Sequence, residues 1–526
     1  MDDMARDNPS ALLIHPPVAK PCEPPAGVAR LAGALGAAGV DCRVYDASLD
    51  GILALIDAPC PAADTWSRRA RRHREAHLAA LRGPDLYRQR DRYKRAVMDI
   101  NRLLHLAGQA SEAHLSLSDY GSARLSPQRS RDLVRAAEQF AANPFYPVFA
   151  RRLAGLFEEQ APTLVGLSLN FTSQALCAFA IIGWIRSQLP KVRIVVGGGL
   201  ATSWHHIPGF GNPFAGLVDD LIAGPGEAAL LALCRAAPVA PPPGTAYALA
   251  RFDRDAYLAP GRVIPYSTSQ GCYWRKCAFC PEKSERTAYR PMAPGAVSAD
   301  LQALAAGHRP RLVHFLDNAL APRLLAHLIA HPPGVPWYGF VRISHHLADA
   351  DFARGLRSAG CVMLKLGVES GDQAVLDALG KGVDLATVSA ALRTLKAAGI
   401  ATYVYLLFGT PAETPDAARR TLDFTLAHAE AVDFLNLAVF NLPAYSDEAA
   451  LLETRPFYDG DLSLYRDFVH PGGWQREHVR RFLAKEFRRP APIRRILASD
   501  PPFFTSNHAP FFAHYRNASP EPRSGR

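Results

Sequence analysis

Three cysteines within nine positions constrain this chain more than any other feature. Cys272, Cys277 and Cys280 follow the strand-like run Val263–Ser267 directly. Three thiolates on one short loop can bind three corners of a cubic iron–sulfur cluster and leave the fourth iron open for chemistry. A structural zinc site is the alternative, but it needs four ligands, often as two separated pairs. The only later cysteine, Cys361, has no cysteine near it that would complete a second pair, so the pattern favours the cluster.

Length and composition predict a multidomain globular protein of the cytoplasm. The chain has 526 residues, of which 48% are hydrophobic and 21% charged, and that length is enough for two or more domains with cores of their own. The charged and polar start, Met1–Ser10, predicts no secretory signal. No apolar run reaches the ~18 residues that a membrane helix needs. The six cysteines outside the cluster loop are scattered, which fits a reducing compartment.

The formal charge of +10 raises the question of a negatively charged partner. Part of the excess lies in the basic run Arg68–Arg74, inside a stretch of helical character. We expect this run to be a solvated helix face, which makes nucleic acid an unlikely partner. A leader peptide or an RNA remains the alternative that the charge leaves open.

The first half of the chain alternates strands with helices. Apolar runs predict strands at 11–14, 42–45, 163–168, 192–196 and 217–223, with helices at 28–38 and 175–189. This alternation predicts an α/β fold with a doubly wound, Rossmann-like parallel sheet and a ligand at the carboxyl ends of its strands. The first strand-to-helix turn is rich in proline instead of glycine, which argues against NAD or FAD.

The second half shows the same alternation in the pattern of a partial barrel. Strands are expected at 263–267, 312–316, 337–343, 362–366, 403–408 and 434–440. Six strands in succession predict a partial (β/α)6 TIM barrel, whose chemistry lies at the carboxyl ends of the strands.

The cluster loop and two later segments together resemble the radical S-adenosylmethionine (SAM) superfamily. That family's usual motif is Cys-x3-Cys-x2-Cys with an aromatic residue before the last cysteine, a place that Phe279 fills. The departure is a gap of four residues, Tyr273–Lys276, where the family has three. Gly367–Gly371 looks like the family's fourth-strand signature, and Leu407–Thr414 looks like its fifth-strand Gly-x-Pro-x-Glu-Thr turn. The resemblance covers residues 263–445.

The front half looks like the cobalamin-binding domain that precedes many radical SAM domains. Ser168-Leu169-Asn170 followed by Gly197-Gly198 keeps the spacing of that fold's Ser-x-Leu segment and Gly-Gly turn, although Asn170 replaces the leucine. The usual cobalt-ligating Asp-x-His-x-x-Gly motif is absent, and His15 is the one histidine in the relevant turn. The resemblance therefore implies cobalamin without a histidine below the cobalt. A degenerate fold that binds no cofactor is the alternative.

The resemblance implies a set of site residues. Cys272, Cys277 and Cys280 are expected to bind a [4Fe-4S] cluster, with SAM on the fourth iron. The remaining expected cofactor contacts are Phe279, Asp317, Asn318, Ser344 and Glu369 in the barrel, and Ser168, Asn170, Gly197 and Gly198 in the front domain. Glu369 is expected to bind the ribose or ammonium of SAM, and the alternative is a salt bridge that braces the turn. Glu413 is expected to cap the helix that follows it.

These expectations combine into a domain plan and a function. The plan places a cobalamin-binding-like domain at 1–240 with a helical insertion at about 60–155, a linker at 241–262, a radical SAM barrel at 263–450 and an extension at 451–526. The implied function is a cobalamin-dependent radical SAM enzyme that methylates an unactivated carbon or phosphorus centre of a peptide or small molecule. Its implied partners are that substrate and an electron donor such as flavodoxin or ferredoxin. A rearrangement, cyclisation or oxidation without methyl transfer remains open, as does a cluster-bearing sensor or an RNA-binding protein.

Overall fold

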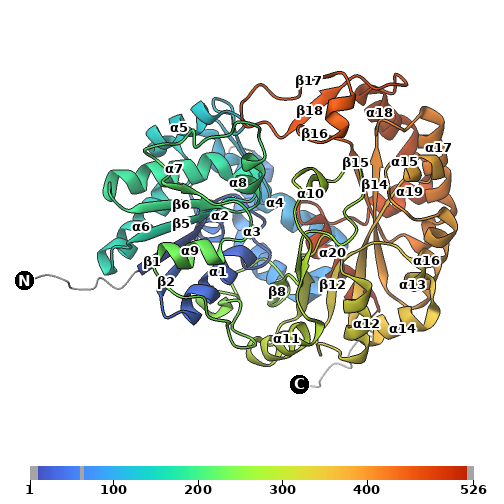
Figure 1. Ribbon diagram of the computed structural model, residues 1–526, viewed down its shortest axis with the longest axis horizontal. Coiled ribbons are helices and arrows are strands. Elements are labelled where there is room, and N and C mark those ends of the chain that lie inside the picture. Colours follow the sequence, from blue (N-terminus) through green and yellow to red (C-terminus); the bar gives the residue numbers. More distant parts are fainter. Residues whose placement is uncertain (1–9, 60–63, 518–526) are drawn as a thin grey trace, which may run out of the picture. The chain divides into compact units, whose positions relative to one another are not determined.

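The computed structural model describes residues 10–59 and 64–517 of the chain, which form two compact units (Figure 1). The first unit comprises residues 1–83, 92–259 and 458–464, and the second comprises 84–91, 260–457 and 465–526. Each unit is built on a parallel sheet of its own.

The sheet of the first unit has five parallel strands in the order β2-β1-β5-β6-β7. These are β1 (Ser10–His15), β2 (Asp41–Asp46), β5 (Leu164–Ser168), β6 (Arg193–Gly197) and β7 (Asp220–Leu221). The strand order reverses between β1 and β5, as in a doubly wound sheet, and confirms the predicted fold class. Strand β7 is much shorter than the predicted 217–223, because Leu217 and Val218 donate their backbone N–H groups to Phe214 O and so close a turn.

Helices connect these strands, and a helical segment enters between α2 and β5. The connecting helices are α1 (Ala26–Ala37), α2 (Ala47–Asp57), α7 (Thr172–Gln188), α8 (Gly199–His205) and α9 (Glu227–Leu233). The inserted elements are α3 (Thr65–Arg82), α4 (Arg90–Gln109), the hairpin β3 (Ala113–Leu115) and β4 (Tyr120–Ser122), α5 (Ser130–Glu138) and α6 (Tyr146–Glu159). Helix α7 is buried almost all round, which explains its lack of a polar face.

The sheet of the second unit has six parallel strands in sequential order, β15-β14-β13-β12-β11-β8. They are β8 (Val263–Tyr266), β11 (Leu312–Phe315), β12 (Trp337–Val341), β13 (Cys361–Glu369), β14 (Ala401–Phe408) and β15 (Phe434–Val439). The helices after these strands include α11 (Pro294–His308), α12 (Pro322–Ala330), α14 (Ala350–Ser358), α16 (Leu385–Ala397) and α17 (Pro415–Ala427). The six predicted strands and the partial barrel are confirmed.

Short elements complete the second unit. The hairpin β9 (Ser269–Gln270) and β10 (Arg290–Pro291) flanks the three cysteines, and α10 (Pro281–Ser284) follows the last of them. The C-terminal part adds α18 (Arg476–Phe482), a π-helical turn at Leu483–Phe487, α19 (Ala491–Leu497) and α20 (Thr505–Asn517). No helix in the described ranges has both the length and the apolar character needed to cross a bilayer.

Candidate functional site

The three cysteines of the cluster loop, Gly271–Pro291, are half-buried and carry no disulfide. Burial raises the pKa of the Cys280 thiol to about 11, while the backbone N–H groups of Glu282 and Lys283 donate to this sulfur and oppose the rise. Burial likewise raises the pKa of Cys277, against the pull of the nearby Lys381 ammonium. Amide donors and a neighbouring cation stabilise a thiolate, which is the form that binds iron. The surroundings of these thiols therefore fit a cluster.

The distance between the thiols decides whether they can bind a single metal ion or a cluster. Within the described ranges, no three side chains of the His, Cys, Asp or Glu type stand close enough to bind one metal ion. Each cysteine of a [4Fe-4S] cluster binds a different iron, so its sulfurs stand farther apart than the ligands of a single ion. The three thiols still act on each other, since the charge of Cys272 contributes to the raised pKa values of both Cys277 and Cys280.

A second loop, Leu379–Gly382 after α15 (Gln373–Ala378), holds the cluster loop in place. Trp274 Nε1 donates to Gly380 O at 2.9 Å, and the Ala278 N–H donates to Leu379 O at 2.9 Å. Gly380 has φ +64°, and a Cβ there would lie 2.7 Å from Lys276 O, so only glycine permits this approach. This loop therefore serves as a physical support for the cysteines.

Arg342 joins these two loops. Its guanidinium lies 3.6 Å from the centroid of the Trp274 ring and donates to Lys381 O at 2.8 Å. A stacked arginine that also donates to a carbonyl fixes both partners, since the guanidinium is planar and always charged. Arg342 was not among the residues expected at the site. The one feature of the sequence that could have indicated its role is its position at a strand end, two residues before Ser344.

Glu369, the last residue of β13, forms a buried ion pair with Lys381. Glu369 Oε1 lies 2.7 Å from Lys381 Nζ, and the two side chains are 10% and 8% exposed. Glu369 has φ +66°, and the register to β14 shifts between Gly367 and Glu369. The bracing salt bridge considered from the sequence is therefore present. Contact between Glu369 and SAM stays a prediction.

Asp317 and Asn318 also brace the cluster loop. Asp317 accepts hydrogen bonds from the backbone N–H and the hydroxyl of Thr268 and from the hydroxyl of Ser269, at 2.6–3.2 Å. Asn318 Nδ2 donates to Glu282 Oε1 at 2.8 Å, two residues after the last cysteine. Both side chains act on the start or the end of the loop, and their contact with a cofactor remains a prediction.

Two further predicted residues differ in their surroundings. Phe279 packs against the apolar side chains of Val375, Leu379 and Ala417, with Lys381 Nζ 5.7 Å from its ring centroid. Ser344 precedes α13 (His345–Ala348) as N-cap, and its side chain accepts no capping hydrogen bond. The Ser344 hydroxyl is therefore available for another partner, whereas the Phe279 ring serves the packing between the loop and the barrel.

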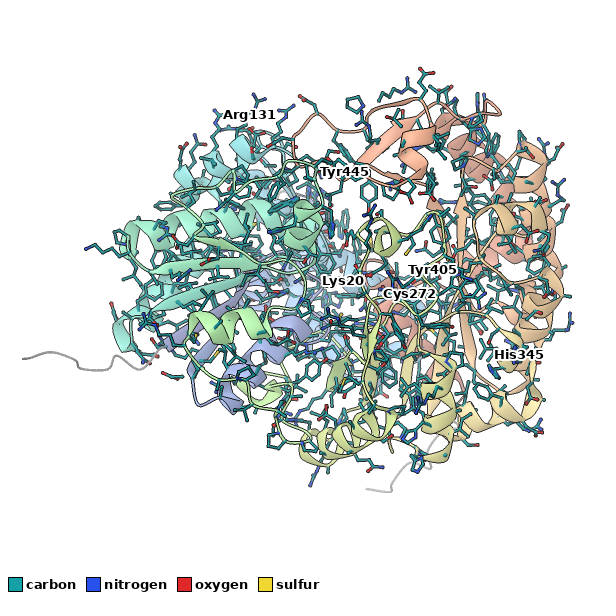
Figure 2. All side chains as sticks on the ribbon, viewed as in Figure 1. Lys20, Arg131, Cys272, His345, Tyr405 and Tyr445 are labelled. Carbon is teal, nitrogen blue, oxygen red and sulfur yellow. The ribbon has the colours of Figure 1, made fainter. Side chains whose placement is uncertain are left out.

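Residues at paired positions of neighbouring strands form layers across the second sheet. Gly367, Tyr405 and Asn436 occupy paired positions on β13, β14 and β15, and all three are partly exposed (Figure 2 labels Tyr405 and Cys272). One layer deeper, Lys365 Nζ lies 3.1 Å from His314 Nε2. This deeper layer is almost fully buried, and the Lys365 ammonium lies among aromatic rings. The sequence did not reveal the layer, because Lys365 and His314 both occur inside apolar runs.

Glu413 has a different role from the predicted helix cap. Thr414 caps α17 through its hydroxyl, while Glu413 Oε2 accepts from Trp474 Nε1 at 2.9 Å and from the Gly409 N–H at 2.5 Å. Glu413 Oε1 is buried without a hydrogen-bond partner among the described residues. Burial raises the pKa of Glu413 to about 7. The prediction of a cap was wrong because Thr414, the better capping residue, already occupies the position.

The raised pKa of Glu413 predicts that stability falls as the pH increases. The native state keeps this proton up to about pH 7, whereas the unfolded chain loses it near pH 4.5. The free energy of unfolding should therefore drop between these two values and level off above them, by at most about 3 kcal/mol. Glu413→Gln should remove this drop in denaturant titrations at pH 5 and pH 8, and the exposed Glu453→Gln should leave it unchanged. An equal pH dependence in wild type and Glu413→Gln would contradict the assignment.

The predicted residues of the first unit meet at the carboxyl ends of β5 and β6. Asn170 Nδ2 donates to Ser168 Oγ at 3.0 Å, and Asn170 Oδ1 accepts from the Gly199 N–H at 3.0 Å. Gly198 has φ +105°, and a Cβ there would lie 2.5 Å from Leu169 O. A Cβ on Gly197 would meet nothing closer than 3.6 Å. Gly198 is therefore required by the chain's own backbone, and Gly197 is the glycine whose open side a ligand can use.

His15 lies at the end of β1 and is buried. Its Nδ1 lies 3.5 Å from Gln174 Nε2, which also donates to Pro16 O at 2.8 Å. Burial lowers the pKa of His15. A neutral histidine engaged with the first turn fits a structural role.

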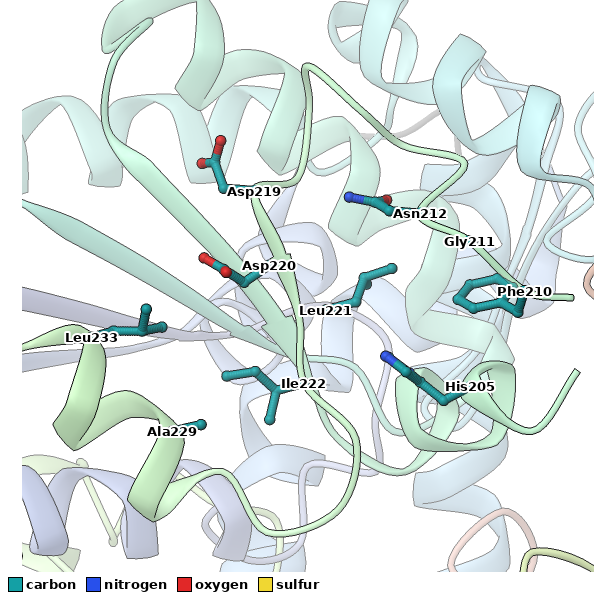
Figure 3. Close-up of a pocket in the computed structure, with 10 residues that line it drawn as sticks. All are labelled: His205, Phe210, Gly211, Asn212, Asp219, Asp220, Leu221, Ile222, Ala229 and Leu233. Atoms are coloured by element: carbon teal, nitrogen blue, oxygen red, sulfur yellow. The ribbon is translucent and has the colours of Figure 1, made fainter.

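A pocket of about 380 Å³ opens beside β7 at the edge of the first sheet (Figure 3). Its lining combines apolar and polar side chains, among them His205, Phe210, Asn212, Leu221 and Ile222. The Ile222 carbonyl is the nearest atom to the open side of Gly197, at 3.6 Å from a Cβ built there. The glycine turn and the pocket therefore share a boundary at Ile222.

Comparisons with solved structures return, among others, two radical SAM enzymes that were also solved with cobalamin bound. The methyltransferase TsrM from Kitasatospora setae, solved with tryptophan substrate and a SAM analog, is 18% identical with a TM-score of 0.49, covering 83% of this chain and 74% of TsrM. OxsB, solved with aqua-cobalamin and SAM, is 14% identical with a TM-score of 0.47, covering 80% of this chain and 52% of OxsB.

Comparisons of sequence return a curated relative and a family model that matches residues of the barrel. A curated relative, the anaerobic magnesium-protoporphyrin IX monomethyl ester cyclase of Cereibacter sphaeroides, is 25% identical over 175 residues. That segment covers 30% of this chain and 27% of the cyclase. Residues 266–425 match the family model described as the Radical SAM superfamily. The matched range contains all three cysteines of the cluster loop and the signature segments at the ends of β13 and β14.

Proposed function

We propose, on the premise that residues 266–425 form a radical SAM domain, that this protein is a cobalamin-dependent radical SAM enzyme that transfers a methyl group to an unactivated carbon or phosphorus centre. The observation that supports it best is the cluster loop, where three half-buried thiols lie on a support formed by Leu379–Gly382. The radical SAM match implies a [4Fe-4S] cluster and SAM, which when bound supply a 5′-deoxyadenosyl radical. The chain's own residues hold the thiols, shield the site and position the substrate.

Cobalamin is the cofactor proposed for the first unit. Ser168, Asn170 and Gly197 lie at the carboxyl ends of adjacent strands, where open α/β sheets bind ligands. Both TsrM and OxsB were solved with cobalamin bound, and the front half of the chain keeps the Ser-x-x and Gly-Gly spacing. We propose that Gly197 lets the cofactor's tail pass close to the backbone and that Ser168 and Asn170 donate or accept hydrogen bonds beside it.

Methyl transfer is tested by following the methyl group. With SAM labelled in its methyl carbon, product that carries the label supports methylation. Product without the label supports rearrangement where its mass equals that of the substrate, and cyclisation or oxidation with loss or gain of atoms where its mass has changed. The sequence similarity to a cyclase makes this second class the specific alternative. The substrate is proposed to be a peptide or a small molecule, with the electron supplied by a separate low-potential protein.

Gly197→Val is expected to abolish cobalamin binding and leave the fold and the iron content unchanged. A valine at Gly198 cannot serve as this test, because it would clash with Leu169 O and disturb the turn by itself. The absorption spectrum of bound cobalamin and the thermal unfolding midpoint measure the two effects, and Gly39→Ala, a turn glycine with open space around it, is the control for a general loss of stability. Full cobalamin occupancy in Gly197→Val would remove this turn from the binding site.

A further inference from the structure

The exposed charges of the cluster loop all have one sign. Within Gly271–Pro291 the exposed charged residues are Arg275, Lys276, Arg286 and Arg290, while Glu282, Lys283 and Glu285 are half-buried. Glu282 accepts from Asn318, and Lys283 pairs with Glu448 at 2.7 Å. Glu282 therefore points to a neighbouring part of the barrel, Glu285 is half-buried, and the exposed charge of the loop is positive.

Three of these four cations have no side-chain partner in the part of the chain that the structure describes. Among the described residues, the side chains of Arg275, Arg286 and Arg290 make no ion pair, hydrogen bond or ring contact, whereas Lys276 Nζ lies 4.9 Å from the centroid of the Trp274 ring. Many other arginines of the chain, such as Arg342, are engaged. A set of unpaired, exposed cations contributes little to stability, and its effect is on the electric field that an approaching molecule meets.

Arg275 stands inside the insertion that lengthens the first cysteine gap. It lies between Cys272 and Cys277, is exposed, and has the left-handed backbone angle φ +52°. Arg286 has the same φ of +52° and follows α10, which begins directly after Cys280. Both cations are thus within six residues of a cluster ligand along the chain, on the solvent side of the loop.

We propose that Arg275, Arg286 and Arg290 form a docking surface for an acidic, low-potential electron-carrier protein of the flavodoxin or ferredoxin type. The inference rests on the proposed function, because a radical SAM enzyme needs one electron from outside for each cleavage of SAM. One electron leaves the reduced carrier, which becomes oxidised by one unit, and enters the cluster; no covalent bond forms or breaks in this step. Positive charge beside the cluster brings the acidic carrier to the place where transfer is shortest, and it raises the rate of encounter at low salt.

The chain contains a matched control on the opposite edge of the barrel sheet. Arg488 and Arg494, near α19, are also exposed and have no side-chain partner among the described residues. Helix α19 packs against β15, the last strand of the sheet, whereas the cluster loop follows β8 at the other edge. Charge reversal at either pair changes the net charge by the same amount, so only position differs.

The first measurement is binding, which needs no catalytic turnover. Oxidised flavodoxin is titrated against the full chain by calorimetry at low salt. Arg275→Glu/Arg286→Glu should raise the dissociation constant at least tenfold, and Arg488→Glu/Arg494→Glu should change it less than twofold. The wild-type affinity should fall as salt is added, since exposed charges are screened. Equal weakening by both variants would show a general effect of net charge and would overturn the proposal. An unchanged affinity in Arg275→Glu/Arg286→Glu would overturn it as well. So would a wild type that binds neither flavodoxin nor a plant-type ferredoxin.

The second measurement separates docking from the function itself. Reduction of the reconstituted cluster is followed by its absorption, with either flavodoxin hydroquinone or the reduced methyl viologen cation as donor. Arg275→Glu/Arg286→Glu should slow reduction by flavodoxin at least tenfold and should not slow reduction by the cationic dye. Failure of the wild type to cleave SAM with both donors would contradict the proposed function, while the binding result would still decide the docking surface. Loss of binding to an anionic peptide or an RNA oligomer, with flavodoxin binding unchanged, would assign the surface to another partner and refute the proposal.

Discussion

Cys277→Ala is expected to lose the cluster and every activity that depends on it. Anaerobically reconstituted wild type should contain about four irons at this site and show broad visible absorption. The variant should lose this absorption and cleave no SAM, because two thiolates cannot hold a cluster that already leaves one iron without a protein ligand. Iron analysis, the visible spectrum and 5′-deoxyadenosine formation measure the three effects.

Cys361→Ala is the matched control for this experiment. Cys361 starts β13, is fully buried, and burial raises the pKa of its thiol, so it has the character of a small core residue. Its replacement should cost little stability and no iron. A full iron complement in the Cys272, Cys277 and Cys280 triple alanine variant would refute the cluster, and bound zinc without iron in protein purified anaerobically would favour the zinc alternative.

Glu369→Ala is expected to destabilise the protein by about 3–5 kcal/mol, because it leaves the buried Lys381 ammonium without its carboxylate. The effect should reach the cluster, since Lys381 belongs to the loop that holds Trp274 and Ala278. Chemical denaturation of the apoprotein measures the loss of stability, and the iron content after reconstitution reports the effect on the loop.

The double variant Glu369→Gln/Lys381→Met separates bracing from SAM binding. It removes both charges together, so most of the lost stability should return. If Glu369 only braces the turn, SAM affinity returns with stability. If its carboxylate also binds SAM, the double variant is stable and still binds SAM at least tenfold more weakly than the wild type, and this second result would support the role expected from the sequence.

The sequence predicted the elements of this fold because its strands are short apolar runs that end at glycine, proline or charged residues. The run 163–168 predicted β5, and the run 362–366 predicted β13, which extends three residues further to Glu369. Parallel strands place their ends at one edge of a sheet. The cysteines were found by spacing alone. Strand β7 was overestimated because a local turn at Phe214, which no apolar pattern reveals, takes up the residues before it.

The supports of the site were not predictable, because they join residues far apart in the chain. The pairing of Glu369 with Lys381 depends on a left-handed backbone angle, and the stacking of Arg342 on Trp274 depends on the path of a loop. Asp317 was expected at a cofactor, and the structure shows in addition that it holds the residues before the cluster loop, a role that the sequence did not reveal. Glu413 was expected as a helix cap, but the neighbouring Thr414 occupies that position.

Each of the two units is formed by several segments that are not contiguous in the chain, so neither unit can be expressed or exchanged as one continuous piece. Residues 458–464 belong to the first unit, where Asp461 Oδ1 accepts from the Ser130 N–H at the start of α5 and Leu462 donates its N–H to Gln128 O. A fragment cut after Ala259 would expose the first turn of α5 without its carboxylate. A gene fusion that exchanges the front half between relatives must therefore carry this short C-terminal segment with it.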